Sequence, residues 1–190
     1  MLKIGIILGS TRPGRNGEAV AKWVQEKVAA REDAQFELVD IQAFDLPLLD
    51  EPVPPSMGKY SKEHTKRWAR KVAELDAFIF VTPEYNHSTS GALKNALDFL
   101  YAEWNNKAAG FVSYGSAGGA RAVEHLRLIA AELQIATVRA QVMFSLAADF
   151  ENYSVFKPGG QHEGTLKTMV DQLVAWGTAM QTVRQGQNRA

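Results

Sequence analysis

Short apolar segments alternate with amphipathic segments along this chain. Residues 3–9 read KIGIILG and residues 77–82 read AFIFVT. Such nearly unbroken runs are typical of parallel strands that are buried on both faces. Further strands are expected at residues 36–41, 107–114 and 136–144, and helices at residues 17–31, 61–75, 89–101, 119–133 and 163–184. The alternation predicts an α/β fold with parallel strands joined by right-handed crossovers.

The number of strands narrows this fold further. Five strands in 190 residues match the doubly wound, flavodoxin-like order 2-1-3-4-5, a three-layer sandwich with helices on both faces of the sheet. No repeat or linker interrupts the pattern, so we expect one domain over residues 1–184 and a polar, frayed tail over residues 185–190. The four prolines within residues 47–58 predict a long surface loop that could form the rim of a site.

Composition excludes several classes of function. Lysine plus arginine and aspartate plus glutamate both number 21, so no net field favours nucleic acid or an anionic membrane as partner. The absence of cysteine excludes disulfides, thiolate metal sites and iron–sulfur clusters, and any redox chemistry must come from a cofactor. The four histidines lack paired spacing, which argues against a metal site. Without a secretory signal or an apolar run of roughly 20 residues, the chain is expected to be cytoplasmic and not membrane-embedded.

A glycine- and arginine-rich loop follows the first strand. Residues 9–17 read GSTRPGRNG and lead into a helix. A helix N-terminus presents unpaired N–H groups and a partial positive charge, which together suit a phosphate. The glycine spacing fits neither GxGxxG nor GxxxxGK[ST], so a monophosphate is favoured over a dinucleotide or a nucleoside triphosphate. The alternative for this loop alone is an ordinary turn with solvated arginines.

Two more loops follow strands that should end at the same edge of the sheet. Residues 82–91 read TPEYNHSTSG and combine a rigid proline exit with an aromatic surface. Residues 113–121 read SYGSAGGAR and leave main-chain donors uncovered. Each loop alone is compatible with a turn and a helix cap. Ligands bind outside the carboxyl ends of parallel strands, so the three loops together predict a site.

These three loops, at these separations, resemble those of the NAD(P)H-dependent FMN reductase family of flavodoxin-like quinone, azo, chromate and FMN reductases. The similarity runs from residue 3 to about residue 144, and PEYN is its most distinctive part. The resemblance implies FMN as cofactor, NADPH or NADH as donor, a small electron acceptor and ping-pong turnover, with no catalytic side chain. It implies cofactor contacts from Ser10, Arg12, Arg15, Asn16 and Gly17 at the phosphate, from Pro83, Glu84, Tyr85, Asn86 and Ser88 along the ring and ribityl chain, and from Ser113, Tyr114, Gly115, Ser116, Gly118 and Gly119 at the ring edge.

Other readings of the same residues stay open. The main rival is a flavodoxin-type electron carrier or redox sensor that binds FMN without efficient NAD(P)H oxidation, and a module for another phosphate ligand is a third reading. His87 either lines the acceptor pocket or is a solvated loop residue. The resemblance implies a homodimer or homotetramer with the region of Trp104 facing a neighbour, whereas Trp104 on composition alone could be buried packing.

Overall fold

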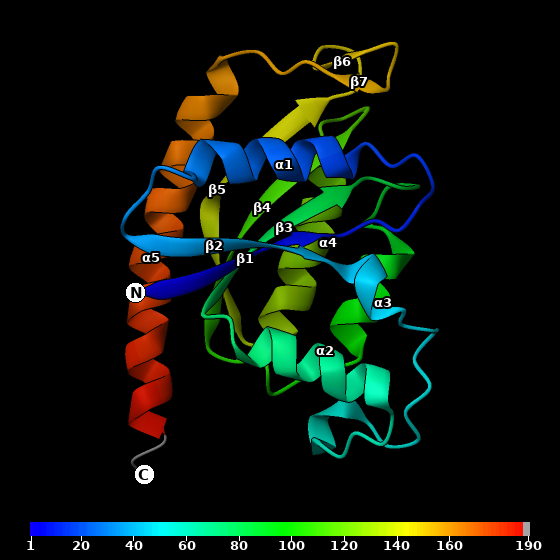
Figure 1. Cartoon of the computed structure of the whole chain (residues 1–190), viewed down its shortest axis with the longest axis vertical. Helices are drawn as coiled ribbons and strands as arrows, with labels where there is room; N and C mark the ends of the chain where they lie inside the picture. Colours follow the sequence, from blue (N-terminus) through cyan, green and yellow to red (C-terminus); the bar gives the residue numbers. More distant parts are fainter. Residues whose placement is uncertain (188–190) are drawn as a thin grey trace.

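The computed structural model describes residues 1–187, and its main sheet has the predicted topology. Five parallel strands lie in the order β2-β1-β3-β4-β5 (Figure 1). They are β1 (Leu2–Leu8), β2 (Ala34–Asp40), β3 (Ala77–Pro83), β4 (Lys107–Gly115) and β5 (Ile135–Ser145). Every residue of β3 and β4 is buried, which explains the unbroken apolar runs in the sequence.

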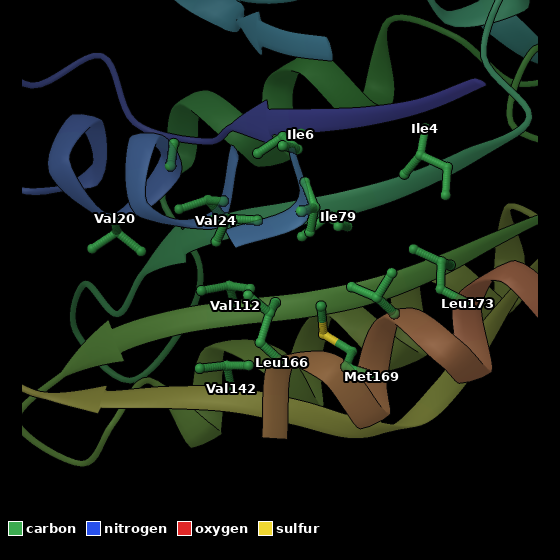
Figure 2. Packing of buried hydrophobic residues seen from close by; sticks show 14 of the residues in the cluster. Ile4, Ile6, Val20, Val24, Ile79, Val112, Val142, Leu166, Met169 and Leu173 are labelled. Carbon is green, nitrogen blue, oxygen red and sulfur yellow. The ribbon is translucent and has the colours of Figure 1, made fainter. Parts of the chain in front are cut away.

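Helices cover both faces of this sheet. The helices α1 (Gly17–Val28) and α5 (Gln161–Gln187) pack on one face, and α2 (Glu63–Ala73), α3 (Gly91–Asp98) and α4 (Ala120–Glu132) pack on the other. Figure 2 shows the packing on the first of these faces, where Ile79 and Val112 of the sheet share one hydrophobic cluster with Val24 of α1 and Met169 of α5. The expected three-layer, flavodoxin-like sandwich is therefore confirmed.

Some elements depart from the prediction. The helix α5 begins at Gln161 and continues to Gln187, so residues 185–187 of the expected frayed tail are helical, while residues 188–190 lie outside the described residues. A hairpin of β6 (Phe150–Glu151) and β7 (Val155–Phe156) was not expected, because two-residue strands carry no readable periodicity. The same holds for the short 3-10 helices η1 (Ile41–Phe44) and η2 (Pro55–Met57). Within residues 1–187, no helix is both long and apolar enough to cross a bilayer.

Trp104 belongs to the core. Its side chain is fully buried, and its indole N–H donates to the carbonyl of Leu97 at 3.1 Å. Trp68 and Phe78 pack edge-on against it at 5.9 and 4.9 Å between ring centroids. The alternative that Trp104 is buried packing is therefore confirmed for its ring, and an interface formed by the surrounding region stays a prediction.

The proline-rich rim loop is held at two points. The Asn95 side chain of α3 accepts from the N–H of Leu49 at 3.0 Å and donates to the carbonyl of Pro47 at 2.6 Å. Farther along, Glu51 accepts from the backbone N–H groups of Ser61 and Lys62, just before α2. Burial alone would raise the pKa of Glu51, but these hydrogen bonds lower it to about 2. The loop is therefore anchored to α3 and to the residues before α2.

Candidate functional site

The first and second loops touch at the carboxyl edge of the sheet. The strands β1 and β3 are neighbours, so the loops that follow them start side by side. The hydroxyls of Ser10 and Tyr85 share a hydrogen bond of 3.0 Å. The exposed guanidinium of Arg12 lies 5.9 Å from the centre of the Tyr85 ring. Tyr85 thus connects the two loops through its hydroxyl and its ring face.

The second and third loops are joined by Glu84. Its backbone N–H donates to the carbonyl of Tyr114 at 2.9 Å. Its carboxylate, with a side chain only 4% exposed, forms an ion pair with the Arg121 guanidinium and accepts from the Arg121 backbone N–H at 3.2 Å. The helix α4 has Gly119 at its N-cap, with no side-chain cap of its own. Glu84 therefore caps α4 from another loop, and its charge faces Arg121.

The tip of the second loop is a tight turn. Tyr85 and Ser88 exchange backbone hydrogen bonds of 2.9 and 3.1 Å, and both intervening residues have positive φ, Asn86 at 48° and His87 at 73°. Asparagine and histidine tolerate this left-handed geometry better than most residues. The Ser88 hydroxyl shares a hydrogen bond of 2.9 Å with Nδ1 of His125. Asn86 and His87 are exposed at the tip, and Pro83 is buried at its base.

The start of α1 is open to an anion. Asn16 occupies the N-cap position, yet its side chain makes no cap and instead donates to the carbonyl of Tyr153 at 2.9 Å. The N–H groups of the first helical turn therefore have no side-chain cap. Gly14 has φ of +69°, and a side chain there would meet no atom within 4 Å, so the loop above the helix start is uncrowded. This arrangement suits a terminal phosphate.

Arg15 binds groups within the protein and stabilises the first loop. Its side chain is 5% exposed and lies between two carboxylates, with Nη1 3.0 Å from Asp40 and Nη2 3.0 Å from Glu18. Nη1 also donates to the carbonyl of Ser10. Burial alone would lower the pKa of Arg15, but the partners Asp40 and Glu18 raise it. Its donors are engaged within the protein, so Arg12 is the arginine of this loop that is exposed to a ligand.

In the third loop the side chains of Ser113 and Tyr114 are buried, so the loop presents mainly backbone at the carboxyl edge of the sheet. The Ser113 hydroxyl donates to the carbonyl of Gly118 at 2.7 Å. Gly119 has φ of +76°, and a Cβ there would lie 2.6 Å from that of Ser113, so the close approach requires glycine. The Tyr114 ring is buried beneath the start of α1, and among the described residues its hydroxyl has no hydrogen-bond partner. Gly115 is buried and Ser116 is exposed at this edge.

The structure brings the expected site residues to one edge of the sheet, with different surroundings for each. Three of them are exposed to solvent, Arg12, Asn86 and Ser116, whereas Gly17 is buried at the start of α1. Others hold the loops together: Ser10, Arg15, Asn16, Glu84, Tyr85, Ser88 and Ser113. An uncapped helix N-terminus beside an aromatic turn and a glycine-rich edge fits FMN in charge and shape. Within residues 1–187, no group of three or more potential metal-ligating side chains is found.

Comparison with known proteins identifies the family. Residues 2–149 match the model of the family described as NADPH-dependent FMN reductase. The chain belongs to this family. An NAD(P)H-dependent FMN reductase from Nectria sp is 38% identical over 181 residues, covering 90% of this chain and 89% of the relative. A quinone reductase from Escherichia coli K12 is 32% identical over 192 residues, covering 96% and 97%.

A solved structure supports the fold. The flavoenzyme NAD(P)H:(acceptor) oxidoreductase from Paracoccus denitrificans superposes with a TM-score of 0.74 at 22% identity, covering 95% of this chain and 99% of that one. Family membership confirms the predicted class, an oxidoreductase of the NAD(P)H-dependent FMN reductase type with FMN and NAD(P)H as cofactors.

Sequence reasoning missed several residues that shape the site. They are Asp40, Arg121 and Tyr153. The helix cap that the second loop was expected to provide is confirmed at Ser90. Ser90 caps α3 at 3.0 Å from the N–H of Leu93 and also donates to the carbonyl of Gly9. The positions of Asp40 and Arg121 beside strand ends were a usable signal, because strand ends of a parallel sheet share one edge. Tyr153 had no such sequence signal, because the periodicity of the sequence does not predict its hairpin.

Proposed function

We propose that this member of the NADPH-dependent FMN reductase family passes electrons from a reduced nicotinamide, through bound FMN, to a small acceptor of the quinone type. The observation that carries the proposal is the joining of three loops at one edge, through Ser10 with Tyr85 and through Glu84 with Arg121. Free flavin, azo compounds and metal ions are the other acceptors we consider. The E. coli quinone reductase supports a quinone as acceptor, since its similarity extends over nearly the whole chain.

In this proposal the first loop holds the FMN phosphate. The uncapped N–H groups at the start of α1 supply fixed donors, and Arg12 supplies an exposed positive charge. Arg15 keeps the loop in shape by pairing with Asp40 and by donating to the carbonyl of Ser10. The phosphate contact expected for Arg15 is thus replaced by a positioning role.

The second and third loops hold the flavin ring. Tyr85 and Asn86 border one side of it, and the backbone from Gly115 to Gly119 borders its edge. FMN supplies the hydride chemistry when bound, accepting from the nicotinamide and delivering to the acceptor. The protein's part is to fix the ring, leave one face open and aim N–H groups at its edge, where they stabilise negative charge. Because donor and acceptor use the same open face in turn, turnover should be ping-pong.

The visible spectrum of the purified protein tests the proposal. Flavin absorbance should bleach on anaerobic addition of NADPH and return on addition of a quinone. Parallel double-reciprocal plots for NADPH and quinone would support alternating use of one site. A protein that takes up no FMN after reconstitution contradicts the proposal.

The electron-carrier alternative predicts a different result. A flavodoxin-type carrier or sensor would bind FMN, and NADPH would not bleach it at a useful rate.

Three further expectations remain predictions: a homodimeric or homotetrameric assembly, a cytoplasmic location and one domain over residues 1–184. Sedimentation of the purified protein checks the first of them.

A further inference from the structure

The β6–β7 hairpin lies at the same edge as the three loops. It follows β5, and the family match ends at residue 149, directly before the hairpin begins at Phe150. Figure 1 shows β6 and β7 above the end of α1 at which the first loop enters. A hydrogen bond from Asn16 to Tyr153 joins the hairpin tip to that loop. The hairpin is therefore a neighbour of the phosphate end of the site, although it lies outside the matched region.

The base of the hairpin is firmly held. Asp149 has a side chain only 4% exposed, and it accepts from the N–H of Ser145 at 2.8 Å and pairs with His162 of α5 at 2.8 Å. Phe150 is buried, with its ring centre 6.1 Å from that of Tyr114. A hairpin fixed in this way can present its tip at a set position.

The tip carries an exposed aromatic ring. Asn152 and Tyr153 have φ of 51° and 57°, and the Tyr153 residue is 68% exposed. An N-cap asparagine usually bonds to its own helix, which is worth about 1 kcal/mol. The Asn16 amide instead donates to the carbonyl of Tyr153. This hydrogen bond leaves the N–H groups at the start of α1 without a side-chain cap and places the Tyr153 backbone beside the first loop.

We propose that the β6–β7 hairpin is a fourth wall of the FMN site, in which the Asn16 amide holds the tip so that the Tyr153 ring covers the phosphate end of the cofactor and slows its release. The proposal rests on the FMN binding proposed above. Asn16 is a positioning residue that acts through the hairpin, and Tyr153 is a binding residue. The ring contributes apolar cover and leaves the helix N–H groups to the phosphate.

Release of FMN from the loaded protein tests the hairpin directly, because flavin fluorescence rises as FMN leaves after dilution. Asn16→Ala should release FMN about three- to tenfold faster, the range expected for one hydrogen bond. Tyr153→Gly, which keeps the positive φ while removing the ring, should have an effect of similar size. The double variant should be no faster than the faster single variant, since the tether acts by placing the ring. Riboflavin, which lacks the phosphate, should show little change in any variant.

Val155→Thr is the matched control. Val155 lies on the same hairpin and is 51% exposed, but it is away from the tip. The variant should therefore release FMN at the rate of the unmodified protein. Hydrogen exchange gives a second readout, because FMN should slow exchange of amides in residues 150–156. Unchanged release in both single variants overturns the proposal. An Asn16→Ala effect that persists in full on the Tyr153→Gly background also overturns it, since Asn16 would then contact FMN directly. If the unmodified protein binds no FMN, the proposed function fails as well.

Discussion

Glu84 and Arg121 form an ion pair that joins the PEYN turn to the first turn of α4. The Glu84 side chain is 4% exposed and the Arg121 side chain is 45% exposed, so a buried carboxylate depends on a partly solvated arginine. The same carboxylate caps α4 through the backbone N–H of Arg121. The pair therefore fixes the distance between the two loops that border the proposed flavin ring.

Replacing Arg121 should lower the free energy of unfolding more than replacing Glu84. Arg121→Gln leaves a buried carboxylate without its countercharge, whereas Glu84→Gln removes that charge and keeps an acceptor for the helix N–H. We expect Arg121→Gln to lower the free energy of unfolding by about 1–3 kcal/mol and Glu84→Gln by less. Urea denaturation measures both, with Arg139→Gln, an exposed arginine of β5, as the control. Equal losses in the two variants would mean that the pair is not electrostatically coupled.

The two arginines of the first loop should separate binding from stability. Arg12 is exposed, so Arg12→Ala should weaken FMN binding about tenfold, or about 1.4 kcal/mol, with little change in the unfolding midpoint. Arg15→Ala should lower the midpoint, because Asp40 loses a buried partner. Fluorescence titration with FMN and thermal unfolding distinguish the roles. An Arg15→Ala protein of normal stability that fails to bind FMN would restore Arg15 as a direct phosphate contact.

Gly17 should not tolerate a side chain. A Cβ at this position would lie 2.8 Å from the Tyr114 hydroxyl and 2.8 Å from Cδ1 of Leu8, so Gly17→Ala should destabilise the protein by about 1–3 kcal/mol. Gly91→Ala is the matched control, because Gly91 also begins a helix and a Cβ there meets no atom within 4 Å. Urea denaturation should show Gly91→Ala to be neutral or slightly stabilising.

Tyr114→Phe tests the same contact from the other side. It removes a buried hydroxyl that has no hydrogen-bond partner among the described residues, so alone it should be neutral or stabilising. Combined with Gly17→Ala it should restore part of the lost free energy of unfolding, since one of the two clashing atoms is gone. Simple additivity of the two changes would show that the clash lies with Leu8 alone.

The main features of the fold and the place of the site were predictable from the sequence because both depend on local pattern. Buried runs such as residues 77–82 read directly as central strands, and strand ends of a parallel sheet share one edge. The hairpin of β6 and β7 was not predictable, since its turn depends on positive φ at Asn152 and Tyr153, residues with no glycine signal.

The role of individual site residues was less predictable than their location. Arg15 and Arg12 are close in sequence and chemically identical, yet one is buried between carboxylates and the other is exposed. That difference is set by Asp40, which is far away in the sequence at the end of β2. Loop composition therefore predicts where a ligand binds, and long-range pairing decides which side chains touch it.

Lys107 should make stability depend on pH. Its amine is buried at the start of β4 and donates to the carbonyl of Val72 at 2.7 Å, which satisfies the C-terminal end of α2. Burial lowers its pKa from 10.5 to about 8, with the charge of Arg184 adding to the effect. Between these two pH values the unfolded chain carries more protons on Lys107 than the folded chain. The free energy of unfolding contributed by this residue should therefore rise with pH, by about 2–3 kcal/mol from pH 8 to 10.5.

Lys107→Met isolates this contribution. Methionine keeps the length and apolar character of the side chain but cannot titrate, so the rise between pH 8 and 10.5 should be smaller in the variant by the amount that Lys107 supplies. At pH 7 the variant also loses the hydrogen bond to Val72 and gains relief from a buried charge, two effects of opposite sign, so the slope with pH is the informative quantity. Lys22 lies at an exposed position of α1, so Lys22→Met should keep the full rise and serves as the control. Urea denaturation of the three proteins at pH 7, 8, 9 and 10 measures the slopes, and identical slopes for Lys107→Met and the unmodified protein would place the charge of Lys107 in solvent.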